Sequence, residues 1–98
     1  MPYAIRVHAV GGPDAMVYEE VAVGNPGPGE ARVRHTAIGV NFIDTYHRSG
    51  LYAVALPSGI GSEAAGVVEA VGSGVDWVKP DDRVAYSGGA PGSYATAR

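Results

Sequence analysis

The chain has 98 residues, of which 46% are hydrophobic and 17% charged, a composition typical of one small folded domain. A net charge of −3 excludes the basic surface that nucleic-acid binding needs, so no nucleic acid is expected as a partner. The absence of cysteine excludes disulfides, thiolate nucleophiles and cysteine-ligated zinc. No stretch approaches the roughly 20 apolar residues that cross a bilayer, and we expect a soluble, cytoplasmic protein without a membrane partner.

The first third of the chain predicts strands over residues 3–9, 16–23 and 31–38. Arg6 and His8 alternate with apolar residues, which is the period of two of a half-buried strand. Residues 24–29 contain two prolines and three glycines, so they form irregular loop. Arg32 and Arg34 alternate along one strand, and we expect them on a solvent-exposed face.

One short helix is expected from Asn41 to Ser49. Asn41 is a typical N-cap residue, and Asp44 three positions later can accept a hydrogen bond from the cap backbone. Two basic residues in the last turn suit the negative end of the helix, and Gly50 follows as a C-terminal glycine. The helix is too short to be stable alone, so tertiary contacts must hold it.

After a loop over residues 51–61, strands are expected over residues 63–71, 83–86 and 93–97. Gly66 lies inside a strand that is apolar on both faces, which indicates close approach of another backbone. Asp81 and Asp82 belong to a polar turn, where adjacent carboxylates point apart and serve as surface charge rather than as an acid–base pair. Six short strands and one helix predict a small, mostly-β barrel or sandwich.

Two patterns resemble known sites but lack their context. Residues 59–64 match the G-x-G-x-x-A pattern of dinucleotide binding, yet a proline-containing loop precedes them and a strand follows, where a helix is required. His8, His35 and His47 fall on three different expected elements, which disfavours a three-histidine metal site.

A more informative cluster surrounds the helix. It combines an amide, a carboxylate, two phenols and a guanidinium, from Asn41, Asp44, Tyr46, Arg48 and Tyr52. Loops and element ends on a rigid scaffold commonly carry binding groups, so this is the candidate functional site. Helix capping and packing tyrosines explain the same residues equally well.

Residues 37–52, with the run Asn41-Phe42-Ile43-Asp44-Thr45-Tyr46, resemble the signature of the NADPH:quinone oxidoreductases, the zeta-crystallin-like branch of the medium-chain dehydrogenase/reductase superfamily. Residues 61–75 and 82–84 are similar to landmarks of the whole superfamily. The resemblance implies a GroES-like, partly open β-barrel that forms the N-terminal, substrate-side domain over residues 1–98. It also implies a chain truncated before a Rossmann domain that binds most of the NADPH, so that the fragment alone is inactive.

The resemblance further implies zinc-free chemistry. The zinc alcohol dehydrogenases of the superfamily have a cysteine in place of Asn41 and a histidine in place of Ser62, and an amide and a hydroxyl are poor zinc ligands. Glu63 is left with a structural hydrogen-bonding role. Asp81 stands where the family commonly has glycine, and aspartate tolerates a positive φ there.

By the same analogy, a quinone or another small carbonyl compound is the substrate, and the full-length protein is a homodimer. The implied catalytic residues are Asn41, Tyr46 and Tyr52. The implied cofactor-binding residues are Asn41, Phe42, Ile43, Asp44, Thr45 and Tyr46. Two alternatives stay open: a zinc-free reductase of enones or acryloyl thioesters, and a non-catalytic GroES-like binding module.

Overall fold

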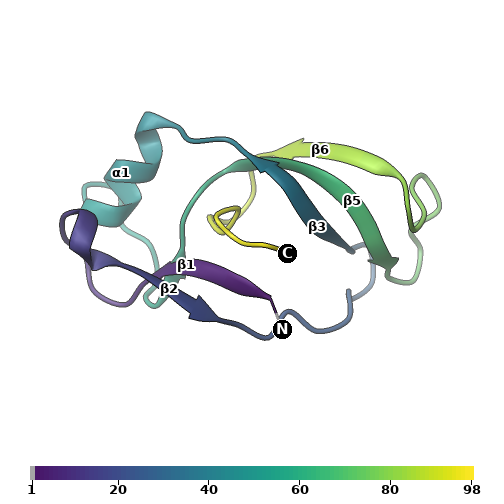
Figure 1. Cartoon of the computed structure of the whole chain (residues 1–98), viewed down its shortest axis with the longest axis horizontal. Coiled ribbons are helices and arrows are strands. Elements are labelled where there is room, and N and C mark those ends of the chain that lie inside the picture. Colours follow the sequence, from purple (N-terminus) through teal and green to yellow (C-terminus); the bar gives the residue numbers. More distant parts are fainter. Residues whose placement is uncertain (1) are drawn as a thin grey trace.

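Two three-stranded antiparallel sheets form the framework of the protein, which a computed structural model describes over residues 2–98. The first sheet has the order β2-β1-β4 and comprises β1 (Tyr3–Val7), β2 (Met16–Glu20) and β4 (Ser58–Gly59). The second has the order β3-β5-β6 and comprises β3 (Ala31–Ile38), β5 (Glu63–Val71) and β6 (Arg83–Ser87). A 3-10 turn, η1 (Pro13–Ala15), precedes β2, and the helix α1 (Phe42–Ser49) lies at one end of the molecule (Figure 1).

The longest strands agree with the sequence pattern. β3 and β5 have the predicted bounds, β1 and β2 end two and three residues early, and β6 is one residue longer. The predicted close approach at Gly66 is confirmed: Gly66 pairs with His35, and a Cβ at Gly66 would overlap the carbonyl oxygen of Arg34. Glycine at this position therefore lets β3 and β5 approach each other.

The last residues hold the two sheets together without forming a regular strand. Residues 93–97 were expected to be a strand, but only isolated bridges form, between Ala95 and Ala4 and between Ala97 and Arg34. The segment is nevertheless extended, and on one side Thr96 N–H donates to the carbonyl of Tyr3 at 2.8 Å. On the other side it is bonded to β3, for example from Val33 N–H to Arg98 O at 2.7 Å. Figure 1 shows the C-terminus between the two sheets.

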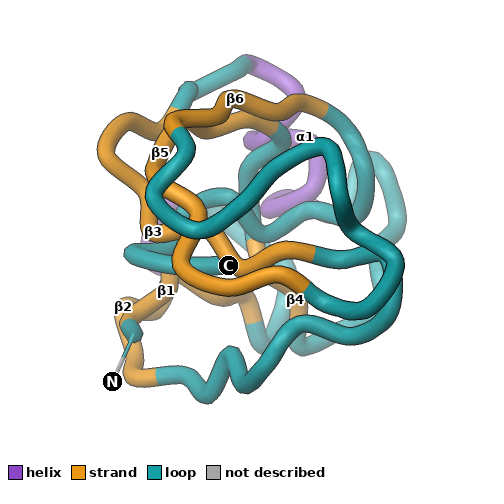
Figure 2. The backbone as a smooth tube through the Cα atoms, turned by 90° about the vertical axis from the view of Figure 1, so that its right-hand side faces the viewer, coloured by secondary structure: helices purple, strands orange, loops and turns teal. Residues whose placement is uncertain are grey.

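The sixth strand is β4, in the region that was expected to be only loop. It has two residues and pairs with β1 through Arg6 with Gly59 and Val7 with Ser58. Long loops connect the strands, as the tube in Figure 2 shows. The structure is therefore the expected mostly-β, partly open barrel with one short helix, in which the closing segment differs from the prediction.

The core lies where the two sheets and the C-terminal segment meet. Its buried side chains include Val7, Val33, Ile60, Val68 and Ala95. A cavity of about 400 Å³ remains between the sheets, and its lining includes Tyr18 of β2 and Ile38 of β3. None of the helices in the described part of the chain has the length and apolar character needed to span a membrane.

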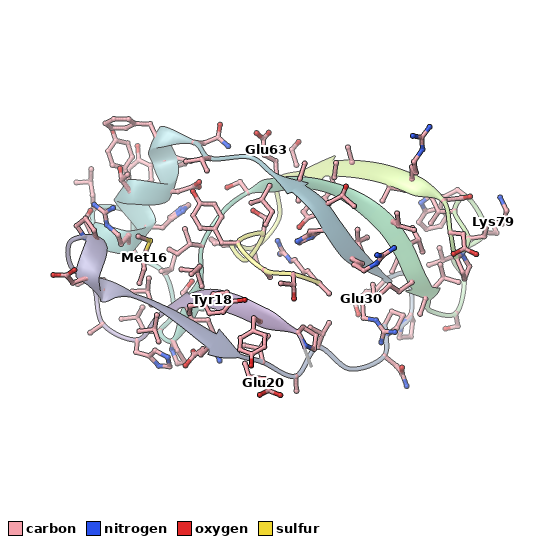
Figure 3. The ribbon with its side chains drawn as sticks, in the orientation of Figure 1. Met16, Tyr18, Glu20, Glu30, Glu63 and Lys79 are labelled. Atoms are coloured by element: carbon pink, nitrogen blue, oxygen red, sulfur yellow. The ribbon has the colours of Figure 1, made fainter. Side chains whose placement is uncertain are left out.

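The polar turn before β6 has the predicted character. Asp81 has a φ of 76°, the positive value expected where the family commonly has glycine. Lys79 Nζ lies 3.0 Å from Asp82 Oδ1, and this hydrogen bond lowers the pKa of the Asp82 carboxyl. In Figure 3, Lys79 lies at the opposite end of the molecule from Met16, so these charges are remote from α1.

The expected charged face on β3 is only partly exposed. Arg34 is exposed, whereas Arg32 is half-buried and its Nε lies 3.1 Å from Glu69 Oε1. Arg32 also donates to the carbonyl of Gly24 at 2.8 Å. Arg32 therefore connects β3 to β5 and to the irregular loop before β3, instead of being solvated.

Candidate functional site

The first turn of α1 is organised by one buried carboxylate. Asn41 precedes the helix in extended conformation, with φ −127° and ψ 153°, and its backbone N–H donates to Asp44 Oδ2 at 3.0 Å. This is the predicted capping hydrogen bond between the N-cap residue and the third helical residue. It satisfies a backbone N–H that has no acceptor within the helix. Asp44 is 3% exposed and is the only buried residue of α1.

A tyrosine from the C-terminal segment completes this arrangement. The hydroxyl of Tyr94 donates to Asp44 Oδ2 at 2.7 Å, so one oxygen accepts two hydrogen bonds. Burial, and secondly the bond to Asp44, raises the pKa of Tyr94 well above its usual value. The other oxygen, Asp44 Oδ1, is buried without a hydrogen-bond partner among residues 2–98.

The last turn of α1 brings two tyrosines together. Gly50 has a φ of 87°, and the backbone N–H groups of Gly50 and Tyr52 both donate to the carbonyl of Tyr46, at 3.1 and 3.2 Å. This left-handed ending reverses the chain, and the rings of Tyr46 and Tyr52 meet edge to face at 5.2 Å. The ring of Phe42, one turn earlier, is 5.4 Å from that of Tyr46. We call Phe42, Tyr46 and Tyr52 the aromatic row.

The aromatic row lies in an exposed apolar surface. Phe42 is 75% exposed and Tyr52 50%, and their neighbours Val40 and Leu51 are 80% and 67% exposed. The hydroxyls of Tyr46 and Tyr52 have no hydrogen-bond partner within residues 2–98. A helix that buries its aspartate and exposes its phenylalanine reverses the usual pattern, and this apolar surface is therefore the candidate site.

The other residues predicted to bind cofactor are arranged differently. Thr45 donates its hydroxyl to the carbonyl of Phe42 at 2.7 Å, within the helix. Ile43 is 38% exposed and Asp44 points into the protein. Asn41 lies at the opposite end of α1 from Tyr52. The structure thus groups the aromatic row in one surface and gives Asp44 an internal partner.

Tyr94 was missed by the sequence analysis. Residues 93, 95 and 97 are buried, and Tyr94, which the sequence placed only within an expected strand, lies between them. Nothing in the local sequence indicates that this side chain reaches a helix 50 positions earlier. The nearest signal in the sequence is the expected strand over residues 93–97, which contains Tyr94.

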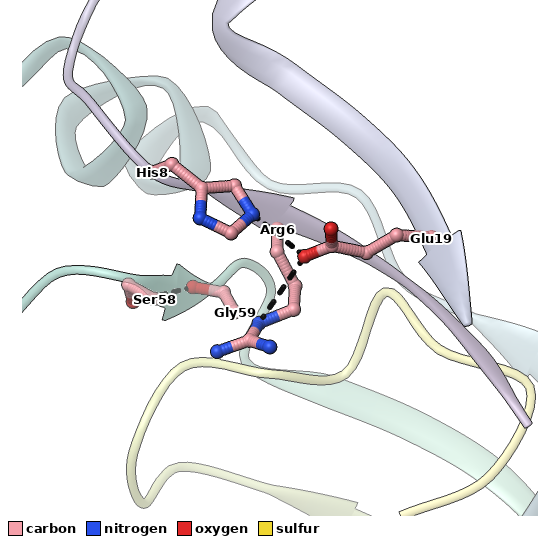
Figure 4. A network of polar contacts seen from close by, with 5 residues as sticks. All are labelled: Arg6, His8, Glu19, Ser58 and Gly59. Atoms are coloured by element: carbon pink, nitrogen blue, oxygen red, sulfur yellow. Dashed lines mark hydrogen bonds and ion pairs between the residues drawn. The ribbon is translucent and has the colours of Figure 1, made fainter. Parts of the chain in front are cut away.

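The three histidines are apart in the chain: His35 lies on β3 and His47 on α1, whereas His8, expected within a strand, follows the end of β1 at Val7. His35 on β3 contacts Ala95 O through Nδ1 at 2.7 Å and the hydroxyl of Tyr86 through Nε2 at 3.0 Å. His8 lies 2.7 Å from Glu19 Oε1, the oxygen that Arg6 also approaches at 3.6 Å (Figure 4). In the described part of the chain no three His, Asp or Glu side chains are grouped as metal ligands would be.

Two further expectations concern residues 59–64. β5 begins at Glu63, so the glycine pattern precedes a strand and not a helix, as argued from the sequence. The expected hydrogen-bonding role of the Glu63 side chain stays a prediction. Its carboxylate packs against Gly39, where a Cβ would overlap it, and the Gly39 N–H donates to the backbone carbonyl of Glu63 at 3.1 Å. Figure 3 shows Glu63 at the start of β5.

The sequence also matches a known family. Residues 27–97 match the alcohol dehydrogenase GroES-like domain, and the chain belongs to that family. Within it, the chain is 56% identical over 96 residues to a quinone oxidoreductase of Pseudomonas aeruginosa, covering 97% of this chain and 30% of the relative. It is 49% identical over 102 residues to a 2-haloacrylate reductase of Burkholderia, covering 100% and 31%.

Solved structures agree with this assignment. The Escherichia coli quinone oxidoreductase complexed with NADPH superposes with a TM-score of 0.95 at 47% identity, over 98% of this chain and 30% of that one. The resemblance to the quinone oxidoreductase branch is thereby confirmed. The chain spans about 30% of the length of the curated relatives it matches.

Proposed function

We propose that this chain is the substrate-side domain, residues 1–98, of an NADPH-dependent quinone oxidoreductase that reduces quinones or similar small carbonyl compounds without a metal. The observation that carries the proposal is the exposed aromatic row beside the cap residue Asn41. The similarity to quinone oxidoreductases, one of them solved with NADPH, supports it.

The aromatic row suits a flat, apolar and electron-poor ring. Edges and faces of Phe42, Tyr46 and Tyr52 offer stacking surface to a quinone or a nicotinamide. The free hydroxyls of Tyr46 and Tyr52 are donors for a quinone oxygen, and such bonds strengthen as negative charge builds on that oxygen. Bound NADPH supplies the reducing equivalents, and the protein orients the substrate and excludes water.

The donor set near Asn41 favours metal-free chemistry. The side chains at the two positions named for zinc ligands are the amide of Asn41 and the hydroxyl of Ser62, neither of which is a good zinc ligand. We expect metal analysis of the purified protein to find no stoichiometric zinc, and one zinc per chain would contradict this part of the proposal.

The proposal extends to the parts of the enzyme that bind the rest of the cofactor. Adenine and phosphate contacts belong to a nucleotide-binding domain, so residues 1–98 alone bind NADPH weakly. We place the full-length protein in the cytoplasm as a homodimer. The threefold greater length of the relatives supports a second domain.

The test replaces one hydroxyl of the aromatic row. Tyr46→Phe in the intact protein keeps the ring and removes the donor, so turnover with a quinone is expected to fall roughly tenfold, as for loss of one hydrogen bond in the transition state. NADPH affinity, measured by fluorescence titration, stays within about twofold, because the variant keeps the ring that can stack on the nicotinamide and the adenine and phosphate contacts belong to the other domain.

Tyr18→Phe is the matched control, since Tyr18 is exposed on β2 and its ring stacks on Tyr3 of the neighbouring strand β1 at 5.0 Å, outside the aromatic row. Its turnover should equal that of the wild type. Unchanged turnover in Tyr46→Phe would make Tyr46 a packing residue and remove the hydroxyl from the mechanism.

The similarity to 2-haloacrylate reductase favours one alternative, reduction of an activated carbon–carbon double bond on the same scaffold. Turnover of 2-haloacrylate, enones and quinones under identical conditions separates the two, with the higher kcat/KM deciding. If the intact protein fails to oxidise NADPH in the presence of any of these compounds, the result would favour a non-catalytic binding module.

A further inference from the structure

The two ends of α1 are held by different parts of the chain. At the C-terminal end, Arg48 is anchored to Gly11, whose N–H donates to Arg48 O at 3.0 Å and whose carbonyl accepts from Arg48 Nε at 3.3 Å. At the N-terminal end, the side-chain contact from outside the helix is Tyr94 to Asp44. An eight-residue helix is not stable alone, so these anchors set its orientation.

The Tyr94 backbone does not need its own hydroxyl to stay in place. Its carbonyl accepts from Ile5 N–H at 2.8 Å, and its N–H donates to Ile60 O at 2.8 Å. Its ring packs over Gly61, where even a Cβ would overlap the ring. The position of Tyr94 is therefore fixed by β1 and by the segment before β5, and its hydroxyl is available to hold something else.

The Tyr94 hydroxyl holds Asp44, in the first turn of α1, where the candidate site begins. Asp44 Oδ2 accepts from Tyr94 at 2.7 Å and from Asn41 N–H at 3.0 Å, so the two donors converge on one atom. Hydrogen bonds to a carboxylate are short and strong, and inside a protein they fix geometry closely. Because Asn41 and Phe42 are consecutive, the same contact sets where the aromatic row begins.

We propose that Tyr94 is a positioning residue of the candidate site: its hydroxyl fixes Asp44, and through Asp44 the backbone of Asn41 and the first turn of α1. Asp44 thereby acts through its neighbours and does not itself contact cofactor. This rests on the proposed function for its catalytic consequence, but the mechanical part concerns α1 alone. A phenol carries its hydrogen throughout the neutral range, and the raised pKa of Tyr94 extends this into alkaline solution.

The experiment compares two phenol-to-phenyl changes in the intact protein. Tyr94→Phe keeps the ring over Gly61 and removes the donor to Asp44. Tyr86→Phe is the matched control, because the Tyr86 hydroxyl on β6 is also hydrogen-bonded to a half-buried side chain, at His35 Nε2 at 3.0 Å, but not to α1. The first readout is amide hydrogen exchange by NMR at Asn41.

Tyr94→Phe is expected to speed exchange of the Asn41 amide roughly tenfold, the effect of one lost hydrogen bond, whereas Tyr86→Phe leaves it unchanged. In quinone turnover, Tyr94→Phe lowers kcat roughly tenfold through misplacement of the aromatic row, with the KM for NADPH within about twofold. Asp44→Asn keeps a carbonyl acceptor and retains most of the protection at Asn41, while Asp44→Leu loses it.

Each outcome decides something. Unchanged exchange at Asn41 in Tyr94→Phe overturns the proposal, as does faster exchange with full kcat in an active enzyme. Equal losses of thermal stability in both tyrosine variants, with kcat intact in both, indicate a purely structural bond and also overturn it. Wild-type protein without quinone reductase activity refutes the proposed function, and the Asn41 amide then still decides whether Tyr94 holds α1.

Discussion

Gly66→Ala tests the close approach of β3 and β5 directly. A Cβ at Gly66 would overlap the carbonyl oxygen of Arg34 and lie 2.8 Å from its carbonyl carbon and 2.9 Å from Val33 Cγ1. Comfortable contacts need about 3.5 Å, so the strands must separate locally by roughly 1 Å. Overpacking of this kind costs roughly 1–3 kcal/mol. Because backbone groups move aside less easily than side chains, we expect the free energy of unfolding to fall by about 3 kcal/mol.

That loss is a large share of the roughly 5–15 kcal/mol by which small domains are stable. With about 4–8 °C per kcal/mol for a chain of this size, the unfolding midpoint should fall by roughly 12–24 °C. Circular dichroism and the fluorescence of Trp77 both follow the transition. Gly12→Ala is the control, since Gly12 has a φ of −78° and nothing within 4 Å of the added Cβ. A midpoint for Gly66→Ala within a few degrees of the wild type would refute the overlap.

Three further outcomes follow from backbone conformation and ionisation. Asp81→Gly relieves a positive φ of 76° at an exposed residue and should raise the free energy of unfolding by about 1 kcal/mol in a urea titration. Gly50→Ala introduces strain at φ 87° of roughly 1–2 kcal/mol and should separate the rings of Tyr46 and Tyr52, seen as loss of ring-current shifts in NMR spectra. Because the folded-state pKa of Tyr94 is raised, its contribution to stability is complete below pH 10 and is lost as pH rises further, with a slope approaching about 1.4 kcal/mol per pH unit; Tyr94→Phe should remove that slope.

Elements with a dense local pattern were predictable. Neighbouring residues predict β3 by their alternation, β5 by a continuous apolar run, and α1 by its cap residues. The bounds of these three elements agree with the sequence. The positive φ at Asp81 also followed from a local comparison with glycine. These features depend on neighbours a few residues apart, which is the range that sequence patterns cover.

Features set by distant partners were not predictable. β4 has two residues beside Pro57, and only its pairing with β1 makes it a strand. The extended segment over residues 93–97 lies between two strands that it bridges only intermittently, so its alternation looked like a regular strand. The burial of Asp44 depends on Tyr94, 50 positions away, and a carboxylate at the third helical position is usually solvated.

The bridging of the sheets by the C-terminal segment has a kinetic consequence. Thr96 bonds Tyr3 and Arg98 bonds Val33, so the contacts that close the barrel join nearly the first and the last residues described. Such high contact order makes folding slow, since a long loop must close before these bonds form. During synthesis on the ribosome, closure of the barrel must therefore wait for residue 96, and until then apolar side chains between the sheets are open to chaperones and to other nascent chains.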